Sequence, residues 1–210
     1  MNGTGRLETR LIAWLGDAPA PHFLGEVALL GPDERDAYEL RHRDDLEKPA
    51  SALAAVADLP ALREIVKADA TGNFRPLRGA PTLRPGWRLG PLMPGELLAA
   101  LNVLYPVALA FWAAQKAGTL AVTGFPETAR RQTGMYRIVQ IATASQLERA
   151  VAEVCEKGCL RCRLWQSGPA SSHRPLGAKA DELPLLCPEA CNYFVAQLRE
   201  QIVREREEEE

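Results

Sequence analysis

The sequence predicts an α+β fold in which a mixed helix and strand scaffold is followed by a small cysteine-rich metal-cluster domain. Apolar residues make up 47% of the 210 residues, so the chain can bury a substantial core. The first part of the chain mixes strand-like alternation with helix-like periodicity. All five cysteines lie within 37 residues, from Cys155 to Cys191. We therefore expect a scaffold domain at residues 1–142 and a metal-binding domain at residues 143–210.

Regular structure is expected in five segments of the scaffold before residue 70. In chain order these are a helix or strand at 7–15, a hairpin of strands at 23–30 and 37–43, and helices at 45–57 and 59–68. Residues 71–95 hold five prolines, five glycines and four arginines without any acid. This composition predicts an ordered surface connector, with an anion-contacting loop as the alternative.

Apolar helices and short strands are expected in the rest of the chain. Residues 97–114 approach the length of a membrane span, but Asn102 and Pro106 interrupt them. We therefore expect a buried, kinked helix pair rather than a span. Further expected elements are strands at 118–123 and 135–141 and a helix at 143–157, with Thr143 or Ser145 as its cap.

The charge balance of the chain bears on its binding partners rather than on its fold. The net charge is −2, so the composition gives no sign of nucleic-acid binding. Residues 199–210 hold six Glu and three Arg, which predicts the solvated end of a helix. Residues 1–15 lack the long apolar core of a signal peptide. Because thiols stay reduced inside cells, the clustered cysteines then indicate a metal site in a cytoplasmic protein without a membrane partner.

The cysteines form two close groups. Cys155, Cys159 and Cys162 have the spacing C-x3-C-x2-C, and Cys187 and Cys191 follow after a loop of 24 residues. Two such groups can close around one site of four thiolates, which is typical of zinc and iron–sulfur sites. One thiol is then spare. We rank Cys155 last, because it lies on the apolar face of its predicted helix.

Three interpretations of the cysteines compete. A [4Fe–4S] cluster is favoured by the compact spacing and by Pro188 directly after Cys187, and Arg161 and Arg163 would offset its negative charge. Structural zinc is the second interpretation, because two close cysteine pairs also match zinc ribbons. Five ordinary buried thiols are the third, which the clustering disfavours.

The segment 130–137 is a separate candidate for binding. It holds three arginines and a tyrosine but no acid. It is either a turn into a strand with solvated arginines, or a recognition element for an anionic ligand or partner. The residues favour both interpretations equally.

Three groups of residues resemble a known family. They are Phe74-Arg75-Pro76-Leu77 with Ala80-Pro81 and Gly86-Trp87, the run from Arg131 to Arg137, and the run from Cys159 to Trp165 with Cys187-Pro188. Together they resemble the C-terminal part of the sirohydrochlorin cobaltochelatase-like family. In that family, two chelatase-like lobes precede a stabilising domain and a small [4Fe–4S]-binding domain.

The resemblance implies a cofactor, a ligand and a pathway. It favours a [4Fe–4S] cluster over zinc, and a role in tetrapyrrole and cobalamin biosynthesis. Sirohydrochlorin-type tetrapyrroles are polycarboxylates, which arginine side chains bind well. The residues that would contact such a ligand are Arg131, Tyr136, Arg137, Arg161 and Arg163.

The chain departs from the family because it lacks the repeated α/β units of the chelatase lobes. The resemblance therefore implies an accessory iron–sulfur protein or domain, which is associated with a chelatase-type partner but does not itself insert metal. The alternatives are a zinc-stabilised interaction module and a stand-alone redox protein.

Overall fold

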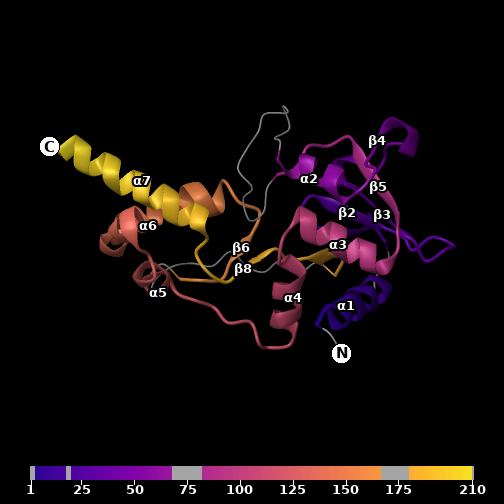
Figure 1. Cartoon of the computed structure of the whole chain (residues 1–210), viewed down its shortest axis with the longest axis horizontal. Helices are drawn as coiled ribbons and strands as arrows, with labels where there is room; N and C mark the ends of the chain where they lie inside the picture. The colour runs from indigo at the N-terminus through magenta and orange to yellow at the C-terminus, as the bar shows by residue number, and fades with distance from the viewer. Residues whose placement is uncertain (1–2, 18–19, 68–81, 167–179, 210) are drawn as a thin grey trace. The chain divides into compact units, whose positions relative to one another are not determined.

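The structure, a computed structural model, describes residues 3–17, 20–67, 82–166 and 180–209. It divides into two compact units, formed by residues 1–118 with 177–185 and by residues 119–176 with 186–210 (Figure 1). Helices and strands are mixed as the α+β prediction requires.

The N-terminal stretch of the first unit ends at residue 118, whereas the sequence predicts a scaffold that continues to residue 142. The reason lies in packing. Residues 134–141 contact the C-terminal helix and the helix at 125–130, both of which belong to the second unit.

A six-stranded mixed sheet forms the centre of the first unit. Its strands are β1 (His22–Leu24), β2 (Val27–Leu30), β3 (Tyr38–His42), β4 (Ala54–Ala55), β5 (Trp87–Leu92) and β7 (Glu182–Leu183). The order is β4-β5-β3-β2-β1-β7, and only the two outer pairs are parallel. The predicted hairpin is confirmed, but its first strand is divided at Gly25. This glycine has φ +58°, and an added Cβ would lie 2.8 Å from the Tyr105 ring.

Strand β5 corrects the prediction of a connector over residues 71–95. Trp87, Leu89 and Leu92 are buried, and β5 pairs with β3 inside the sheet. Gly90 and Pro91 together oppose Glu39 as a β-bulge, which accommodates residues that strands normally avoid. The bulge explains why composition alone suggested a loop. Residues 68–81 lie outside the described part of the chain, and they include the family-like residues Phe74 to Leu77 and Ala80-Pro81.

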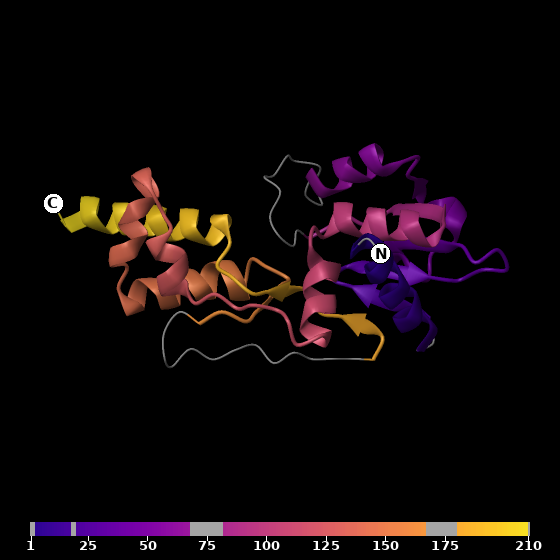
Figure 2. The same cartoon turned by 60° about the horizontal axis from the view of Figure 1, so that its bottom comes forward.

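Four helices pack in the first unit: α1 (Gly3–Asp17), α2 (Leu59–Lys67), α3 (Pro94–Leu104) and α4 (Ala108–Lys116). Helix α3 contacts the other three helices and β5, as Figure 2 shows from the side. The predicted break at Tyr105-Pro106 is confirmed, because α3 and α4 meet there at an angle of 107°. No single helix among the described residues has the length and apolar character to cross a membrane, although this bent pair does so when its two helices are taken together.

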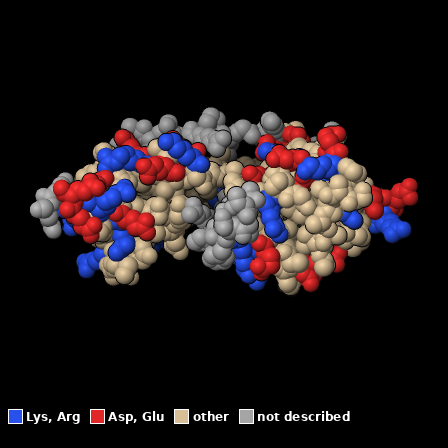
Figure 3. Space-filling model, turned by 90° about the horizontal axis from the view of Figure 1, so that it is seen from above, with Lys and Arg blue, Asp and Glu red and all other residues tan. Residues whose placement is uncertain are grey.

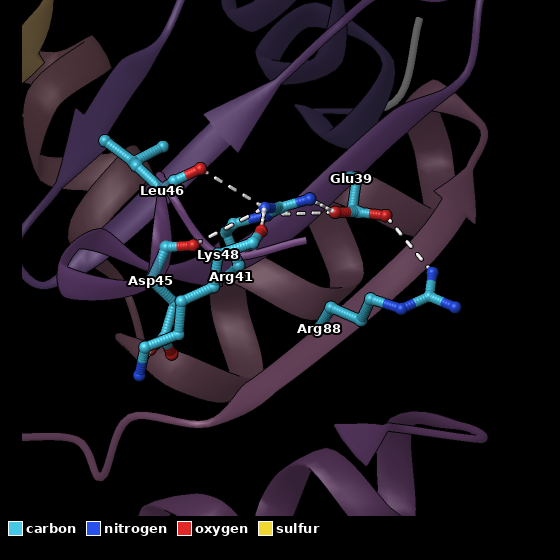
Figure 4. A network of polar contacts seen from close by, with 6 residues as sticks. All are labelled: Glu39, Arg41, Asp45, Leu46, Lys48 and Arg88. Carbon is cyan, nitrogen blue, oxygen red and sulfur yellow. Dashed lines mark hydrogen bonds and ion pairs between the residues drawn. The ribbon is translucent and has the colours of Figure 1, made fainter. Parts of the chain in front are cut away.

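The predicted helix over residues 45–57 is wrong. This region contains the single 3-10 turns η1 (Arg43–Asp45) and η2 (Ala50–Ala52), followed by β4. Buried charges hold the chain here (Figure 4). Arg41 bonds to Glu39, and its Nη1 donates to the carbonyl oxygens of Asp45, Leu46 and Lys48 at 3.5, 3.5 and 3.1 Å. In a helix these carbonyl oxygens would accept from backbone N–H groups. Because the guanidinium of Arg41 engages all three, the segment forms a tight loop instead.

The second unit is mainly helical. It contains α5 (Phe125–Arg130), the 3-10 helix η3 (Gly134–Ile141), α6 (Ala144–Ala150), the π-helical turn η4 (Val151–Glu156), the short strands β6 (Cys162–Arg163) and β8 (Leu186–Cys187), and α7 (Asn192–Glu209). The predicted helix at 143–157 is confirmed as α6 continued by η4. The Thr143 side chain caps it by accepting from the backbone N of Gln146.

The two strands predicted at 118–123 and 135–141 are wrong. Residues 118–123 form no strand, although the backbone N of Thr123 donates to the carbonyl oxygen of Pro188 at 2.9 Å. Residues 135–141 form η3, because Val139 is fully buried and η3 packs on α7. Packing here outweighs the β-propensity of the sequence.

Three aromatic rings form the centre of the second core. The ring centroid of Trp165 lies 4.9 Å from that of Phe194 and 6.3 Å from that of Phe125. Trp165 and Phe194 are fully buried, and apolar residues of η3, α6, η4 and α7 surround them. This core holds the segments that carry the cysteines.

Candidate metal centre

Short elements of the second unit position all five cysteines. Cys155 lies in η4, Cys159 follows it, and Cys162 begins β6. Cys187 ends β8, and Cys191 directly precedes α7. Strands β6 and β8 pair in parallel, so the backbone brings the two sequence groups together. The expectation that the groups meet at one place is consistent with this pairing.

Burial and mutual repulsion keep two of the thiols protonated in the metal-free protein. Burial, together with the neighbouring Cys187, Cys191 and Cys159, raises the pKa of the Cys155 thiol to about 12. Burial likewise raises the pKa of Cys187 to about 11, with Cys191 and Cys159 acting in the same direction. Four of the thiols therefore influence one another, and they must release protons when they bind a metal.

The side chains of Cys162 and Cys187 point to opposite faces of the β6–β8 ladder. In the parallel ladder Cys162 pairs with Leu186, whereas Arg163 pairs with Cys187. Since successive side chains of a strand point to opposite faces, Cys162 and Cys187 lie on opposite faces of this ladder. The sequence ranked Cys155 as the spare thiol. The electrostatic effects on its pKa instead group Cys155 with Cys159, Cys187 and Cys191.

Backbone N–H groups point at two of the sulfurs. The N–H of Arg161 donates to Cys159 Sγ at 3.4 Å, and the N–H of Phe194 donates to Cys191 Sγ at 3.5 Å. Phe194 lies in the first turn of α7, whose free N–H groups stabilise negative charge. These contacts suit thiolates better than neutral thiols.

Two arginines expected beside the ligands are buried there. Arg161 and Arg163 are 8% and 7% exposed. Arg161 donates to the carbonyl oxygen of Leu186 at 2.7 Å, and Arg163 donates to that of Trp165 at 3.0 Å. Arg163 opposes the rise in the pKa of Cys155, and Arg161 opposes that of Cys187. Their burial makes them neighbours of the thiols rather than contacts for an external tetrapyrrole.

The arginine-rich segment is divided between two environments. Arg131 forms an ion pair with Glu189, which lies between Cys187 and Cys191. Tyr136 is 39% exposed, and the guanidinium of Arg199 lies 5.9 Å from its ring centre. Arg137 is exposed to solvent. Tyr136 and Arg137 are exposed and form no ion pair with the described residues, whereas Arg131 is exposed but already paired with Glu189.

Sequence reasoning missed Glu189 and Trp165. The carbonyl oxygen of Glu189 accepts from the thiol of Cys187 at 3.2 Å. The Nε1 of Trp165 is buried and completes no hydrogen bond of normal geometry with the described residues. Trp165 ends the family-like run that begins at Cys159, but the sequence assigned it no role, and the signal for Glu189 was its closeness to Cys187 and Cys191.

The donor set fits an iron–sulfur cluster. Five thiols, two buried arginines and a buried indole N–H without a well-formed hydrogen bond gather in one unit. Thiolates and nearby N–H donors are what such clusters require. Within the residues described, no three Cys, His, Asp or Glu side chains gather closely enough to hold a single metal ion.

An α+β unit and a mainly helical unit that bears five free thiols define a two-domain protein of the cysteine-rich class. Residues 117–200 match the model of a 4Fe-4S iron-sulfur cluster binding domain, and residues 9–116 match that of the DR2241 stabilising domain. The chain belongs to the DR2241 family, since the second model alone spans more than half of it. This confirms the resemblance on which the sequence analysis rests.

A solved structure is similar over most of the chain. The chain is 33% identical to DR2241 from Deinococcus radiodurans, with a TM-score of 0.78 over 95% of this chain and 42% of that one. DR2241 is described as a multi-domain protein with structural similarity to chelatases and with two additional novel domains. The present chain thus spans about two fifths of the relative's length. A search of curated proteins found no match.

Charged side chains of both signs cover the surface. On the face shown in Figure 3, basic and acidic residues are interspersed. In the second unit, Arg149 pairs with Glu205 of α7, and Arg131 pairs with Glu189. This mixture is typical of a surface that does not attract polyanions by charge alone.

Proposed function

We propose that the second unit binds one [4Fe–4S] cluster and that the chain is an accessory to a tetrapyrrole chelatase of the sirohydrochlorin type. The observation that carries the first part is the meeting of two cysteine groups within a region that matches a cluster-binding domain. When bound, the cluster would supply one-electron chemistry or structural support. The chain's own residues hold it, shield it and tune its charge.

The proposed ligands are Cys155, Cys159, Cys187 and Cys191. Their mutual electrostatic influence supports this choice, as do the N–H donors at Cys159 and Cys191. The proposed role of Arg161 and Arg163 is to offset the negative charge of four thiolates inside the protein. Cys162 is the fifth thiol in this assignment.

Anaerobic reconstitution with iron and sulfide tests the cofactor. We expect about four iron and four sulfide per chain, the composition of one cubane cluster. The visible absorption should bleach on reduction. A colourless protein that binds one zinc per chain and no iron would overturn the cluster and favour a zinc-stabilised interaction module.

The chelatase association rests on the relative, which is described as similar to chelatases. We propose a chelatase-type protein or domain as the partner and a polycarboxylate tetrapyrrole as the ligand. The exposed Tyr136 and Arg137 are the residues proposed to contact it. Both lie on η3, and Arg130, also exposed, ends the preceding helix.

Anaerobic titration with sirohydrochlorin tests this second part. Arg137→Met should weaken binding several-fold, because it removes a cation that can pair with a carboxylate. The matched control is Arg63→Met, which removes an exposed arginine from α2 of the first unit. Equal binding by the wild type and both variants would reject Arg137 as a tetrapyrrole contact. The iron and sulfide content tests the cluster separately.

A further inference from the structure

We propose that the indole N–H of Trp165 donates a hydrogen bond to the sulfur of Cys187 in the cluster-loaded protein and thereby raises the reduction potential of the cluster. The inference deepens the proposed function and rests on it, because it requires Cys187 to be a ligand. Trp165 acts on the cluster through that ligand, so it is a positioning residue rather than a catalytic one.

The first observation is a buried donor without a well-formed hydrogen bond. Trp165 is fully buried, and its Nε1 completes no hydrogen bond of normal geometry with the described residues. A buried N–H in this state is destabilising, so a strong acceptor that arrives beside it gains a ready partner. By contrast, the Nε1 of Trp87 in the first unit donates to the carbonyl oxygen of Arg84 at 2.8 Å.

The second observation is that Trp165 lies beside Cys187. Arg163 pairs with Cys187 in the β6–β8 ladder, and the backbone N of Leu164 donates to the carbonyl oxygen of Cys187 at 2.9 Å. Trp165 is the next residue of that strand segment. Its indole is placed as a side-chain hydrogen-bond donor toward the sulfur of Cys187.

The third observation is that the indole cannot turn away. The guanidinium of Arg163 lies 5.1 Å from the ring centre, and Arg163 also bonds the carbonyl oxygen of Trp165. The ring of Phe194 meets the indole edge-on at 4.9 Å, and Phe125 packs at 6.3 Å. A donor fixed on several sides is preorganised, so little entropy is lost when an acceptor arrives.

Metal binding would create that acceptor. In the metal-free protein the thiol of Cys187 is itself a donor, to the carbonyl oxygen of Glu189 at 3.2 Å. Binding to iron removes the thiol proton to solvent, which leaves a sulfur that can only accept. The indole N–H is the buried donor that can then pair with it.

The hydrogen bond is expected to raise the reduction potential of the cluster because the reduced cluster carries more negative charge. Reduction adds one electron to the cluster, and the electron comes from the external reductant. An N–H donor on a ligand sulfur stabilises the more negative reduced state more than the oxidised state. The hydrogen bond therefore makes reduction easier.

Anaerobic redox titration of cluster-loaded Trp165→Phe tests the proposal. We expect the equilibrium constant for reduction to fall about three- to tenfold, where tenfold corresponds to 59 mV for a one-electron couple. Trp87→Phe is the matched control, because its buried N–H already has an acceptor, and its potential should equal that of the wild type. A wild-type potential in Trp165→Phe would overturn the proposal.

A second variant addresses poor folding of the phenylalanine protein. Replacing Trp165 with benzothienylalanine keeps the ring shape but puts sulfur in place of the N–H, and the same negative shift is expected. Iron release from the oxidised protein to a chelator should also be about two- to fivefold faster in both variants. Unchanged potential and unchanged release would reject the inference, whereas loss of iron and sulfide from the wild type would instead reject the proposed cluster.

Discussion

Arg131 forms an ion pair with Glu189, and this contact ties the end of α5 to the loop between Cys187 and Cys191. The backbone of the same loop accepts from Thr123 at Pro188 and from the thiol of Cys187 at Glu189. An arginine that the sequence suggested as a contact for an external anion therefore has an internal carboxylate. Its expected role is to hold half of the cysteine site in place.

Arg131→Met should loosen the cluster without unfolding the protein. Both side chains are about half exposed (51% and 42%), so the pair contributes less than about 1 kcal/mol to folding. We expect chelator-driven iron release to accelerate about two- to fivefold, the factor that such an energy allows. The control is Arg149→Met, which breaks the pair with Glu205 on α7. Equal acceleration in both variants would show a general loss of stability instead.

Single cysteine replacements should separate four thiols from the fifth. Serine at position 155, 159, 187 or 191 removes a proposed thiolate ligand, so iron content after reconstitution should fall strongly. Cys162→Ser should retain the cluster, because this side chain lies on the opposite face of the β6–β8 ladder from Cys187. Iron and sulfide analysis measures the outcome. Retention in Cys155→Ser together with loss in Cys162→Ser would restore the ranking that the sequence suggested.

Arg41→Met should strongly destabilise the first unit. Arg41 is 9% exposed and bonds to Glu39 and to three carbonyl oxygens of the following loop (Figure 4). Removing one partner of a buried charged contact costs about 3–5 kcal/mol, because the remaining groups stay buried. Urea denaturation followed by circular dichroism measures the loss. Arg63→Met, at an exposed position, should change stability by less than about 0.5 kcal/mol.

Asp45 should make the first unit sensitive to acid. Burial alone would raise the pKa of this carboxyl, but the ion pair with Lys48 at 2.7 Å and the N–H of Gly86 at 2.5 Å outweigh it and lower the pKa below 3.8. A lowered folded-state pKa stabilises the protein above the unfolded-state value. That contribution is lost as the pH falls through the folded-state value.

Asp45→Asn should therefore remove part of the pH dependence. We expect its free energy of unfolding to be lower by about 1–3 kcal/mol at pH 7 and to approach that of the wild type in strong acid. Denaturation midpoints between neutral and acidic pH measure this. Asp17→Asn changes an exposed carboxyl at the end of α1 and should follow the wild type throughout. Parallel curves for the wild type and Asp45→Asn would contradict the assignment.

The sequence predicted correctly those elements that are determined by neighbouring residues along the chain. The cap at Thr143, the break at Tyr105-Pro106 and the hairpin around residues 31–36 each follow from the residues themselves. Strand β5 could not be predicted in this way. Its glycine and proline are tolerated only because a bulge against Glu39 absorbs them, and that bulge exists only within the folded sheet.

The site was predictable to the extent that spacing determines it. Two cysteine groups on either side of a loop indicate a shared site, whatever the fold between them. Spacing carries no information on which face of a strand a thiol occupies, and so it could not distinguish Cys155 from Cys162. The neighbours Trp165 and Glu189 depend on the β6–β8 pairing and on core packing, which no local pattern encodes.

Strand β7 lies between the two cysteine groups along the chain, yet it pairs with β1 in the sheet of the first unit. During synthesis, the ribosome therefore releases three cysteines, then the last strand of the sheet, and only then Cys187 and Cys191. A nascent chain that stops after β7 has every strand of its sheet but only three thiols for a cluster that needs four. With the proposed ligands, a complete cluster would therefore form only after translation has passed Cys191.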